Sequence, residues 1–546
     1  MTEPTHATAE TATTYTFEAF AAAAVEDTLV RQPVLASSLG DHRFDGHLDD
    51  LRPAALDEER NVITGRLAEL HQWDDVELPL GHRVDAEVLS VRLRERLFDI
   101  EEGGEYTWNP LVANPGTALY LLLARDYAPL PDRLRSAGAR LREIPEQLEV
   151  ARATLHDMPR VHVETAIGQF GGTIGLLDDI AGQIADLPDI RRHVEPALEA
   201  ARVALNTHVE WLNAELESAA GNPRLGRDTF ARKLSLVLDV DLSPEQVLQA
   251  ALDEIVVLED RIAEVAAKLG GTPREVLDRL ALDVPTNDTV VAVAQDALAE
   301  ATAFVAEHAL ITMYDDPVDV IVMPEIHRGV AVAYCDPPGP LDPPGTTTFF
   351  AISPTPADWP PERVASFYRE CNLHNLRNLV IHEAMPGHVL QLAHSRRGPV
   401  PTRVHQTYWS GPFVEGWAVY AEAEMVRQGF GGLTVAMQQL KMRLRATINA
   451  VLDVRVHCDG LTEADAMALM TGRGHQEEGE AAGKWRRAQL TSAQLSTYYV
   501  GGRQVTDVVA RLRAAHPEWS DRQVHDTVLG HGNPPPRHLP AILGLE

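Results

Sequence analysis

The chain has few cysteines and no long apolar run. Only three cysteines occur among its 546 residues, Cys335, Cys371 and Cys458, and none of them forms a CxxC pair. This argues against a disulfide framework and against a zinc site built from thiolates. No stretch approaches the run of about 18 uncharged apolar residues that a membrane span requires. The N-terminus also lacks the positive start and apolar run of a signal peptide. We therefore expect a cytoplasmic protein with no membrane partner.

Basic residues are also scarce. Lysine and arginine number 48 against 80 acidic residues, which gives a formal charge of −32. Such a charge repels phosphate backbones, so we expect no nucleic-acid partner. It permits a cationic or peptide substrate and attracts metal ions, although an acidic surface is usually no more than a solvated one. Composition does not indicate the oligomeric state.

Most of the chain has the apolar spacing of α-helices. Apolar residues recur at intervals of three and four positions in residues 82–102, 190–218, 245–269 and 288–308. Before the third of these, Ser243-Pro-Glu-Gln predicts a helix start, with a capping residue, a proline in the first turn and then an acid. Residues 1–15 are small and polar, and we expect a flexible tail there. Residues 16–315 are predicted to form a helical lobe.

Between about residues 315 and 362 the composition changes. Three short runs rich in β-branched residues, 318–323, 329–334 and 346–352, are interrupted by a segment rich in proline and glycine. We predict a small β-ribbon, which either offers an edge strand to an extended peptide or serves only as a structural flap. Helix returns at about Pro361. The prediction is a mainly α protein whose residues 316–546 form a catalytic lobe, joined with the first lobe in one integrated fold.

The segment His-Glu-Ala-Met-Pro-Gly-His begins at His382 and ends at His388. A catalytic zinc takes about three protein ligands, usually His and carboxylate, and needs a general base beside its open position. In H-E-x-x-H the second histidine follows one helical turn after the first, but here Pro386 occupies that place. On a straight helix six residues turn by about 600°, which would leave the two histidines about 120° apart. Because Pro386 cannot continue a helix and Gly387 adds backbone freedom, we predict a break that returns His388 toward His382.

A third ligand is expected from the helix that follows Ser410. Glu415 and Glu422 are seven residues apart and share one face of that helix. Apolar and aromatic neighbours indicate that the helix is largely buried, and buried carboxylates need a cation or hydrogen-bond partners. We expect Glu415 to complete the metal site and Glu422 to orient a histidine. A His-Glu pair with a later histidine also occurs by chance, so the pattern alone leaves an ordinary helix surface as the alternative.

These segments resemble a known family. The His382–His388 segment, together with Glu-Gly-Trp-Ala-Val-Tyr-Ala-Glu at residues 415–422, resembles the bacterial proteins grouped as domain of unknown function 885 (DUF885). That family is similar to helical zinc peptidases such as thimet oligopeptidase and carboxypeptidase Taq. Residues 453–457 and 494–501 resemble two further family segments. Ser492-Ala493 stands where the family usually has proline-glycine, which hints at a specialised substrate.

The resemblance implies a large two-lobed, zincin-like helical fold, with the β-ribbon next to a deep active-site channel. It also implies one Zn²⁺, or another divalent metal, bound by His382, His388 and Glu415. Glu383 would then be the general base that activates water.

Hydrolysis of this kind places negative charge on a carbonyl oxygen, which a donor on the opposite wall usually stabilises. Tyr498 and His457 are the candidate donors, and Asp453 is the candidate partner that orients His457. Each of them is otherwise an ordinary core residue. Arg396 and Arg397 either meet a substrate carboxylate or lie solvated at a helix end.

We expect a metallopeptidase that hydrolyses short peptides. One alternative is a metal-dependent hydrolase of a non-peptide amide or specialised metabolite. The other is a helical binding protein that has lost the chemistry. The sequence identifies neither the substrate-binding residues nor the scissile bond.

Overall fold

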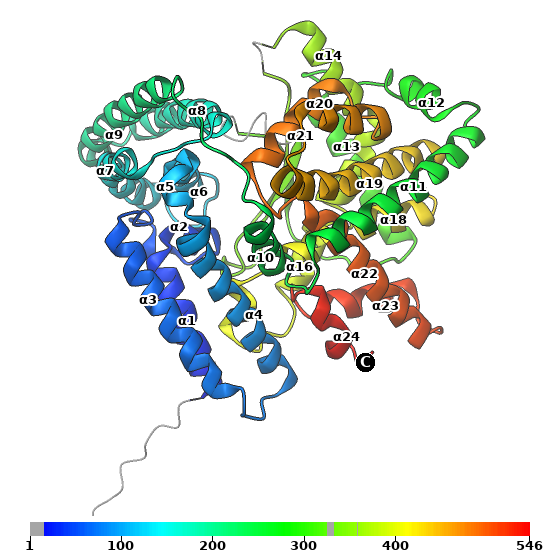
Figure 1. The fold of residues 1–546 in the computed structure, drawn as a ribbon, viewed down its shortest axis with the longest axis horizontal. Helices are drawn as coiled ribbons and strands as arrows, with labels where there is room; N and C mark the ends of the chain where they lie inside the picture. The colour runs from blue at the N-terminus through cyan, green and yellow to red at the C-terminus, as the bar shows by residue number, and fades with distance from the viewer. Residues whose placement is uncertain (1–15, 325–331, 357–358, 546) are drawn as a thin grey trace, which may run out of the picture.

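The computed structural model describes residues 16–324, 332–356 and 359–545. The predicted tail, residues 1–15, lies outside this part of the chain. Helices dominate the fold and a single small sheet accompanies them in the described residues, so the mainly α class is confirmed (Figure 1). None of the helices in the described residues is long and apolar enough to cross a membrane.

Two groups of helices begin the chain. The first group packs around Phe20 and Leu89, and the second packs around Leu141, Phe170 and Leu205 and lies on one side of the molecule (Figure 1). The first group consists of α1 (Phe17–Arg31), α2 (Pro33–Ser38), α3 (Pro53–Leu70) and α4 (Leu80–Phe98). Two short helices, α5 (Glu105–Trp108) and α6 (Gly116–Leu123), follow it. The second group is formed mainly by α7 (Leu130–Thr154), α8 (Arg160–Ile184) and α9 (Pro188–Glu215).

The next helices are α10 (Arg227–Leu238), α11 (Pro244–Lys268), α12 (Pro273–Leu280) and α13 (Val290–Glu307). The four helices expected from apolar spacing are confirmed as α4, α9, α11 and α13, with ends shifted by a few residues. The start at Ser243 is also confirmed. Its Oγ accepts from the Gln246 amide at 3.2 Å, and the Gln246 side chain accepts from the Ser243 amide at 2.8 Å. These two bonds satisfy amides that the first helical turn leaves without a partner.

The predicted β element is a three-stranded mixed sheet rather than a ribbon. Its strands are β1 (Val318–Val322), β2 (Ala333–Asp336) and β3 (Thr348–Ile352), in the order β1-β3-β2. The central strand β3 is parallel to β1 and antiparallel to β2. The composition could not show which strand is central, because pairing depends on how the connections run. Part of the predicted run 329–334 lies outside the described residues.

The remaining helices build the site region. α18 packs along α22, and α15 packs against both α18 and α19. In order they are α14 (Pro361–Glu370), α15 (Leu373–Glu383), α16 (His388–Ser395), α17 (Arg403–Thr407), α18 (Gly411–Arg427), α19 (Gly432–Val454), α20 (Glu463–Ala468), α21 (Glu478–Leu490), α22 (Ser496–Ala515), α23 (Asp521–Leu529) and α24 (Leu539–Ile542).

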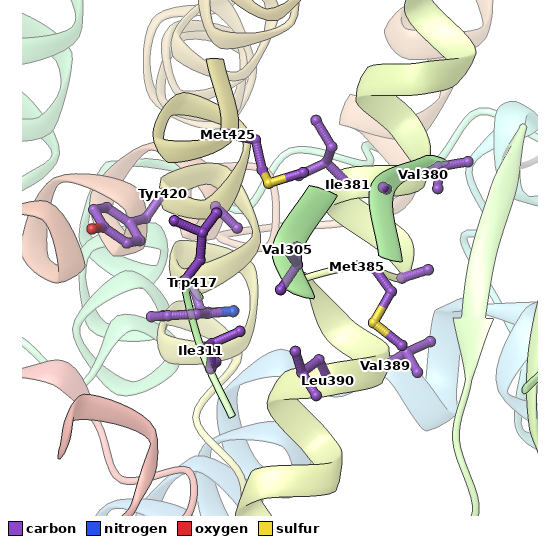
Figure 2. Close-up of a cluster of buried hydrophobic side chains, with 14 of the residues drawn as sticks. Val305, Ile311, Val380, Ile381, Met385, Val389, Leu390, Trp417, Tyr420 and Met425 are labelled. Atoms are coloured by element: carbon purple, nitrogen blue, oxygen red, sulfur yellow. The ribbon is translucent and has the colours of Figure 1, made fainter. Parts of the chain in front are cut away.

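A hydrophobic cluster supports the helices that carry the candidate site (Figure 2). Ile381 from α15 and Leu390 from α16 lie in it together with Met425 from α18. Val305 and Ile311 belong to the same cluster, although they precede the expected boundary at residue 315. The division into residues 16–315 and 316–546 stays a prediction.

Candidate metal centre

The helix that carries His382 breaks at Pro386 and Gly387, as the sequence predicted. α15 ends at Glu383 and α16 begins at His388. The Gly387 amide donates to the carbonyl of Ile381 at 2.9 Å, and a Cβ at Gly387 would lie 1.9 Å from the carbonyl oxygen of His382. Only glycine fits this approach.

The indole of Trp417 holds the turn between α15 and α16. Its Nε1 donates to the carbonyl of Pro386 at 2.8 Å, and the side chain is buried. Trp417 belongs to α18, the helix that also carries Glu415. A hydrogen bond therefore joins the turn between α15 and α16 to α18, the helix that supplies the third candidate ligand. The sequence indicated that Trp417 is buried but did not indicate this bond.

The structure brings His382, His388 and Glu415 together. Oε2 of Glu415 lies 3.4 Å from Nε2 of His382 and 3.7 Å from Nε2 of His388. One ligand atom from each residue lies within 4.8 Å of the others. Ligands about 2.1 Å from a tetrahedral zinc stand about 3.4 Å apart, so these spacings fit the ion.

One buried carboxylate oxygen in this cluster has no hydrogen-bond partner among the described residues. Oε2 of Glu415 is buried and accepts no hydrogen bond within the described part of the chain. Burying such an oxygen is costly unless a cation or donor compensates it. A metal ion between Glu415 and the two imidazoles would do so. The donor set therefore fits the expected metal in chemistry as well as in spacing.

Glu422 and Asn378 fix the orientation of His382. Nδ1 of His382 lies 2.7 Å from Oε1 of Glu422, and the amide of Asn378 donates to the other Glu422 oxygen at 2.8 Å. A proton on Nδ1 leaves Nε2 available to a metal. Asn378 was not anticipated, although it lies one helical turn before His382 on α15. Burial lowers the pKa of His382, but the carboxylates of Glu415 and Glu422 outweigh it and hold that pKa well above its usual range.

The other two candidate ligands have the protonation states that a metal requires. Burial lowers the pKa of His388 to about 4, so its imidazole is neutral near pH 7. Burial alone would raise the pKa of Glu415, but the interactions with His382 and His388 keep it below the usual value. A neutral imidazole and an ionised carboxylate are the forms that bind metal ions.

A strand of the small sheet holds the candidate base. The backbone amide of Cys335, on β2, donates to Oε2 of Glu383 at 3.0 Å. Burial raises the pKa of Glu383 to about 7, with a further contribution from Glu415 and an opposing one from His382. A base with a pKa near the working pH transfers protons efficiently. The contact with Cys335 joins two distant segments and left no signal in the sequence.

Tyr498 lies beside the same cluster. The centre of its ring is 6.4 Å from that of His382. Its hydroxyl accepts from Nη2 of Arg487 at 3.2 Å and from Nε2 of Gln494 at 3.3 Å. Because both neighbours are donors, the hydroxyl proton remains available for donation to a third group. Burial, followed by the charge of Glu415, raises the pKa of Tyr498, which favours the protonated donor form.

Two glycines allow Tyr498 to approach the cluster. A Cβ at Gly416 would lie 2.4 Å from the backbone of Gly501, and a Cβ at Gly501 would lie 2.0 Å from the carbonyl oxygen of Pro412. α18 and α22 therefore meet backbone to backbone. This close contact places the start of α22, with Tyr498, next to Glu415.

His457 does not join the site, and the prediction of a catalytic role for it is corrected. Its Nε2 lies 2.9 Å from the carbonyl of Thr491, and its Nδ1 accepts from the Leu225 amide at 3.4 Å. The ring stacks on Phe230. Burial lowers the pKa of His457 to about 4. Both ring nitrogens are thus committed to backbone groups, and His457 is absent from the wall of the cavity that holds the metal cluster.

Asp453 does not orient His457, so that expectation is also corrected. Its carboxylate accepts from the amides of Ala493 and Ser496 and from the Ser496 hydroxyl, at 2.7–3.0 Å. These bonds secure the loop before α22. Asp453 therefore supports the position of Tyr498 through the backbone.

Arg396 and Arg397 are occupied as well. Both contact the carboxylate of Asp316, and Arg397 makes two bonds to it at 2.8 Å. Because both side chains are already engaged by Asp316, they are poorly placed to receive a substrate carboxylate.

The metal cluster lies on the wall of a large cavity. Its volume is about 1680 Å³. Residues of α8 line it from the first half of the chain, and residues of β2, α15, α18, α19 and α21 line it from the second half. Tyr498, Glu383 and the three candidate ligands all reach this space. An extended substrate could therefore contact base, donor and metal ligands at once.

Comparisons with known proteins agree with the resemblance seen in the sequence. The family model described as "Bacterial protein of unknown function (DUF885)" matches residues 33–543. No curated protein matches the sequence significantly.

Two solved structures share the fold over almost the whole chain. A candidate lipoprotein of unknown function from Shewanella oneidensis is 27% identical, with 97% of this chain and 99% of that one covered and a TM-score of 0.81. A candidate lipoprotein from Colwellia psychrerythraea is 16% identical over the same shares, with a TM-score of 0.78. An M32 carboxypeptidase from Deinococcus radiodurans is 12% identical over 90% of this chain and 94% of its own, but its TM-score of 0.36 is too low to carry an argument.

The comparisons correct the predicted cytoplasmic location. The two structures named above, from Shewanella oneidensis and Colwellia psychrerythraea, are described as candidate lipoproteins. A lipoprotein is held at a membrane by attached lipid chains, and such an anchor needs no spanning helix. The lack of a long apolar run, on which the prediction depended, is therefore insufficient evidence for the cytoplasm.

Proposed function

We propose that this chain, which belongs to the DUF885 family, is a metal-dependent hydrolase that cleaves amide bonds, most readily those of short peptides. The observation that carries the proposal is the buried Oε2 of Glu415, which accepts no hydrogen bond from the described residues and faces the Nε2 atoms of His382 and His388. Three ligand atoms with this chemistry and spacing suit one Zn²⁺ or a similar divalent ion. The remaining groups nearby are those that hydrolysis requires.

Each of these groups has a definite part. A bound divalent ion supplies Lewis acidity toward a carbonyl oxygen and lowers the pKa of water. Glu383, held by the Cys335 amide, takes a proton from the attacking water and passes it to the leaving amine. The hydroxyl of Tyr498 donates a hydrogen bond to the carbonyl oxygen as negative charge develops there. Glu422 keeps His382 in the orientation that binding requires.

The cavity favours a peptide over a small metabolite. Its volume of about 1680 Å³ exceeds the roughly 300–1,000 Å³ of usual small-molecule pockets. β2 is an edge strand of the sheet, and residues 332–335 line the cavity. An extended peptide could add to that edge. In this proposal the two-lobed, zincin-like arrangement corresponds to the two halves of the chain that line the channel.

The test combines metal analysis with turnover. Purified protein supplied with zinc should hold about one equivalent, and a mixture of short peptides should be cleaved only by the loaded form. The Glu383→Gln variant should retain the metal and lose about 10²–10⁴-fold in rate. Exposed Glu264 of α11 provides the matched control, because Glu264→Gln should leave both properties unchanged.

Other outcomes would identify the alternatives. Turnover of amide-containing metabolites but not of peptides would assign the same centre to a specialised metabolite. Protein that takes up no divalent ion would exclude the hydrolase and leave a binding protein.

A further inference from the structure

Two basic side chains of α21 line the cavity, and neither forms an ion pair with a carboxylate of the described residues. Lys484 and Arg487 are three positions apart, so they lie on neighbouring turns of one helix face. Lys484 is 5% exposed and has no hydrogen bond or ion pair within residues 16–324, 332–356 and 359–545. In the same part of the chain the side chain of Arg487 bonds only to neutral groups, those of Gln494 and Tyr498.

The nearby carboxylates already have other partners. Glu370 accepts from Lys441 at 2.9 Å, and Glu480 pairs with Arg445. Glu415 faces the two histidines. Within the part of the chain that the structure describes, buried Lys484 is therefore left without a counter-ion.

An unpaired buried ammonium is costly. Burial, followed by repulsion from Arg445 and Arg487, lowers the pKa of Lys484 well below its usual range. An anion in the cavity would oppose both effects, because it would favour the ammonium form of Lys484 and screen the charges of the two arginines. The α21 face thus presents two basic side chains that an anion in the cavity would stabilise.

We propose that Lys484 and Arg487 form a subsite for the C-terminal carboxylate of a peptide substrate. The inference rests on the proposed hydrolase function and specifies its substrate class. An arginine fork and a lysine ammonium together match the planar, two-oxygen shape of a carboxylate. The protein as a whole is strongly acidic and repels anions, whereas this basic face would attract the negative end of a peptide locally.

The position of the subsite indicates where cleavage occurs. Arg487 bonds to Tyr498, whose ring stacks beside that of His382. One extended residue spans at most about 3.6 Å, so with the C-terminal carboxylate held here the metal cluster meets a peptide bond within the last few residues. The C–N bond before those residues breaks. The hydroxyl of water joins the acyl carbon, and its hydrogen goes to the released amine.

Binding tests this inference separately from catalysis. The probes are N-acetyl-trialanine, its C-terminal carboxamide, and the carboxamide with aspartate in place of the last alanine. Binding to zinc-loaded Glu383→Gln protein is measured by calorimetry. The free acid should bind at least about tenfold more tightly than the carboxamide, as expected for one charge-assisted contact. If the aspartate amide binds as tightly as the free acid, the subsite takes side-chain carboxylates and the C-terminal assignment is overturned.

Matched variants locate the effect. Lys484→Met, in the same background, should remove the preference for the acid, and Lys484→Arg should retain it. Lys268→Met, the same change at an exposed lysine that ends α11, should leave the preference intact. Equal binding of acid and carboxamide, no binding of either, or an unchanged preference in Lys484→Met would each overturn the subsite.

The two proposals fail in distinguishable ways. Zinc-dependent cleavage of the acid and the carboxamide at equal rates would refute the subsite and leave the hydrolase standing. An acid preference in binding that depends on Lys484, without cleavage of any peptide, would retain the subsite and refute the hydrolase.

Discussion

Oε1 of Glu422 lies 2.7 Å from Nδ1 of His382, while the Nε2 of the same ring faces Glu415. The imidazole is therefore held between two carboxylates of one helix, α18. One carboxylate orients the ring, and the other shares the candidate metal position. Glu415 and Glu422 can contact the two nitrogens of one ring because they are seven residues apart and share one face of α18.

Replacing the orienting carboxylate should weaken metal binding. Glu422→Gln removes the charge that favours a proton on Nδ1 of His382, so zinc affinity should fall about 10–100-fold. Competition with a chelating dye measures the change. Glu264→Gln serves as the control. An affinity equal to that of the native protein would contradict the role of Glu422.

Removing the hydroxyl of Tyr498 should affect turnover but not metal content. Tyr498→Phe deletes the proposed donor, and the rate should fall about 10²–10³-fold, as for loss of one oxyanion donor. The neighbouring Tyr499 packs in a separate hydrophobic cluster, and its hydroxyl accepts from Arg503, so Tyr499→Phe is the matched control. Steady-state kinetics on the zinc-loaded proteins decides the matter, and equal losses in both variants would argue for a structural effect.

The turn at Gly387 should not tolerate a side chain. In Gly387→Ala the new Cβ would collide with the carbonyl oxygen of His382, 1.9 Å away, so stability should fall by about 1–3 kcal/mol. Zinc binding should weaken with it, since the turn places His388. Gly182→Ala is the control, because a Cβ there meets nothing within 4 Å. Thermal unfolding of both variants gives the comparison, and two equally stable proteins would refute the geometric argument.

A buried acid on α18 should make stability depend on pH. Bonds from Arg427 and Gln428 outweigh burial and lower the pKa of Glu424 to about 2. A lowered pKa stabilises the fold above the unfolded value near 4.5, and this contribution is lost as the pH falls toward 2. The contribution at neutral pH is about 3 kcal/mol.

Urea unfolding of native protein and Glu424→Gln tests this linkage. The variant should be less stable at pH 7, and the difference should shrink between pH 5 and pH 3. A difference that stays constant over this range would show that packing, rather than ionisation, accounts for the loss.

Much of the fold could be predicted because its signals are local. Apolar spacing predicted α4, α9, α11 and α13, and the residues around Ser243 predicted a helix start. Periodicity and caps reflect the geometry of a single helix, so one segment contains all the information needed. Strand order could not be predicted, because it depends on where long connections return.

For the candidate site, the sequence by itself determined the break at Pro386-Gly387, since the chemistry of proline and glycine acts within one turn. It also supplied the pair Glu415 and Glu422, because their spacing on one helix is a sequence property. Only the tertiary structure decided which distant groups meet. Packing placed the Cys335 amide on Glu383 and kept His457, which sequence favoured as a donor, away from the cavity among backbone partners.

The same holds for the unpartnered Lys484. Its sequence neighbours do not distinguish it from a solvated lysine, and only the folding of α21 against the cavity buries it with no counter-ion among the described residues. Local geometry is encoded residue by residue, whereas burial and charge compensation are properties of elements packed together. The sequence therefore determined the candidate metal ligands, and the tertiary structure decided what surrounds them.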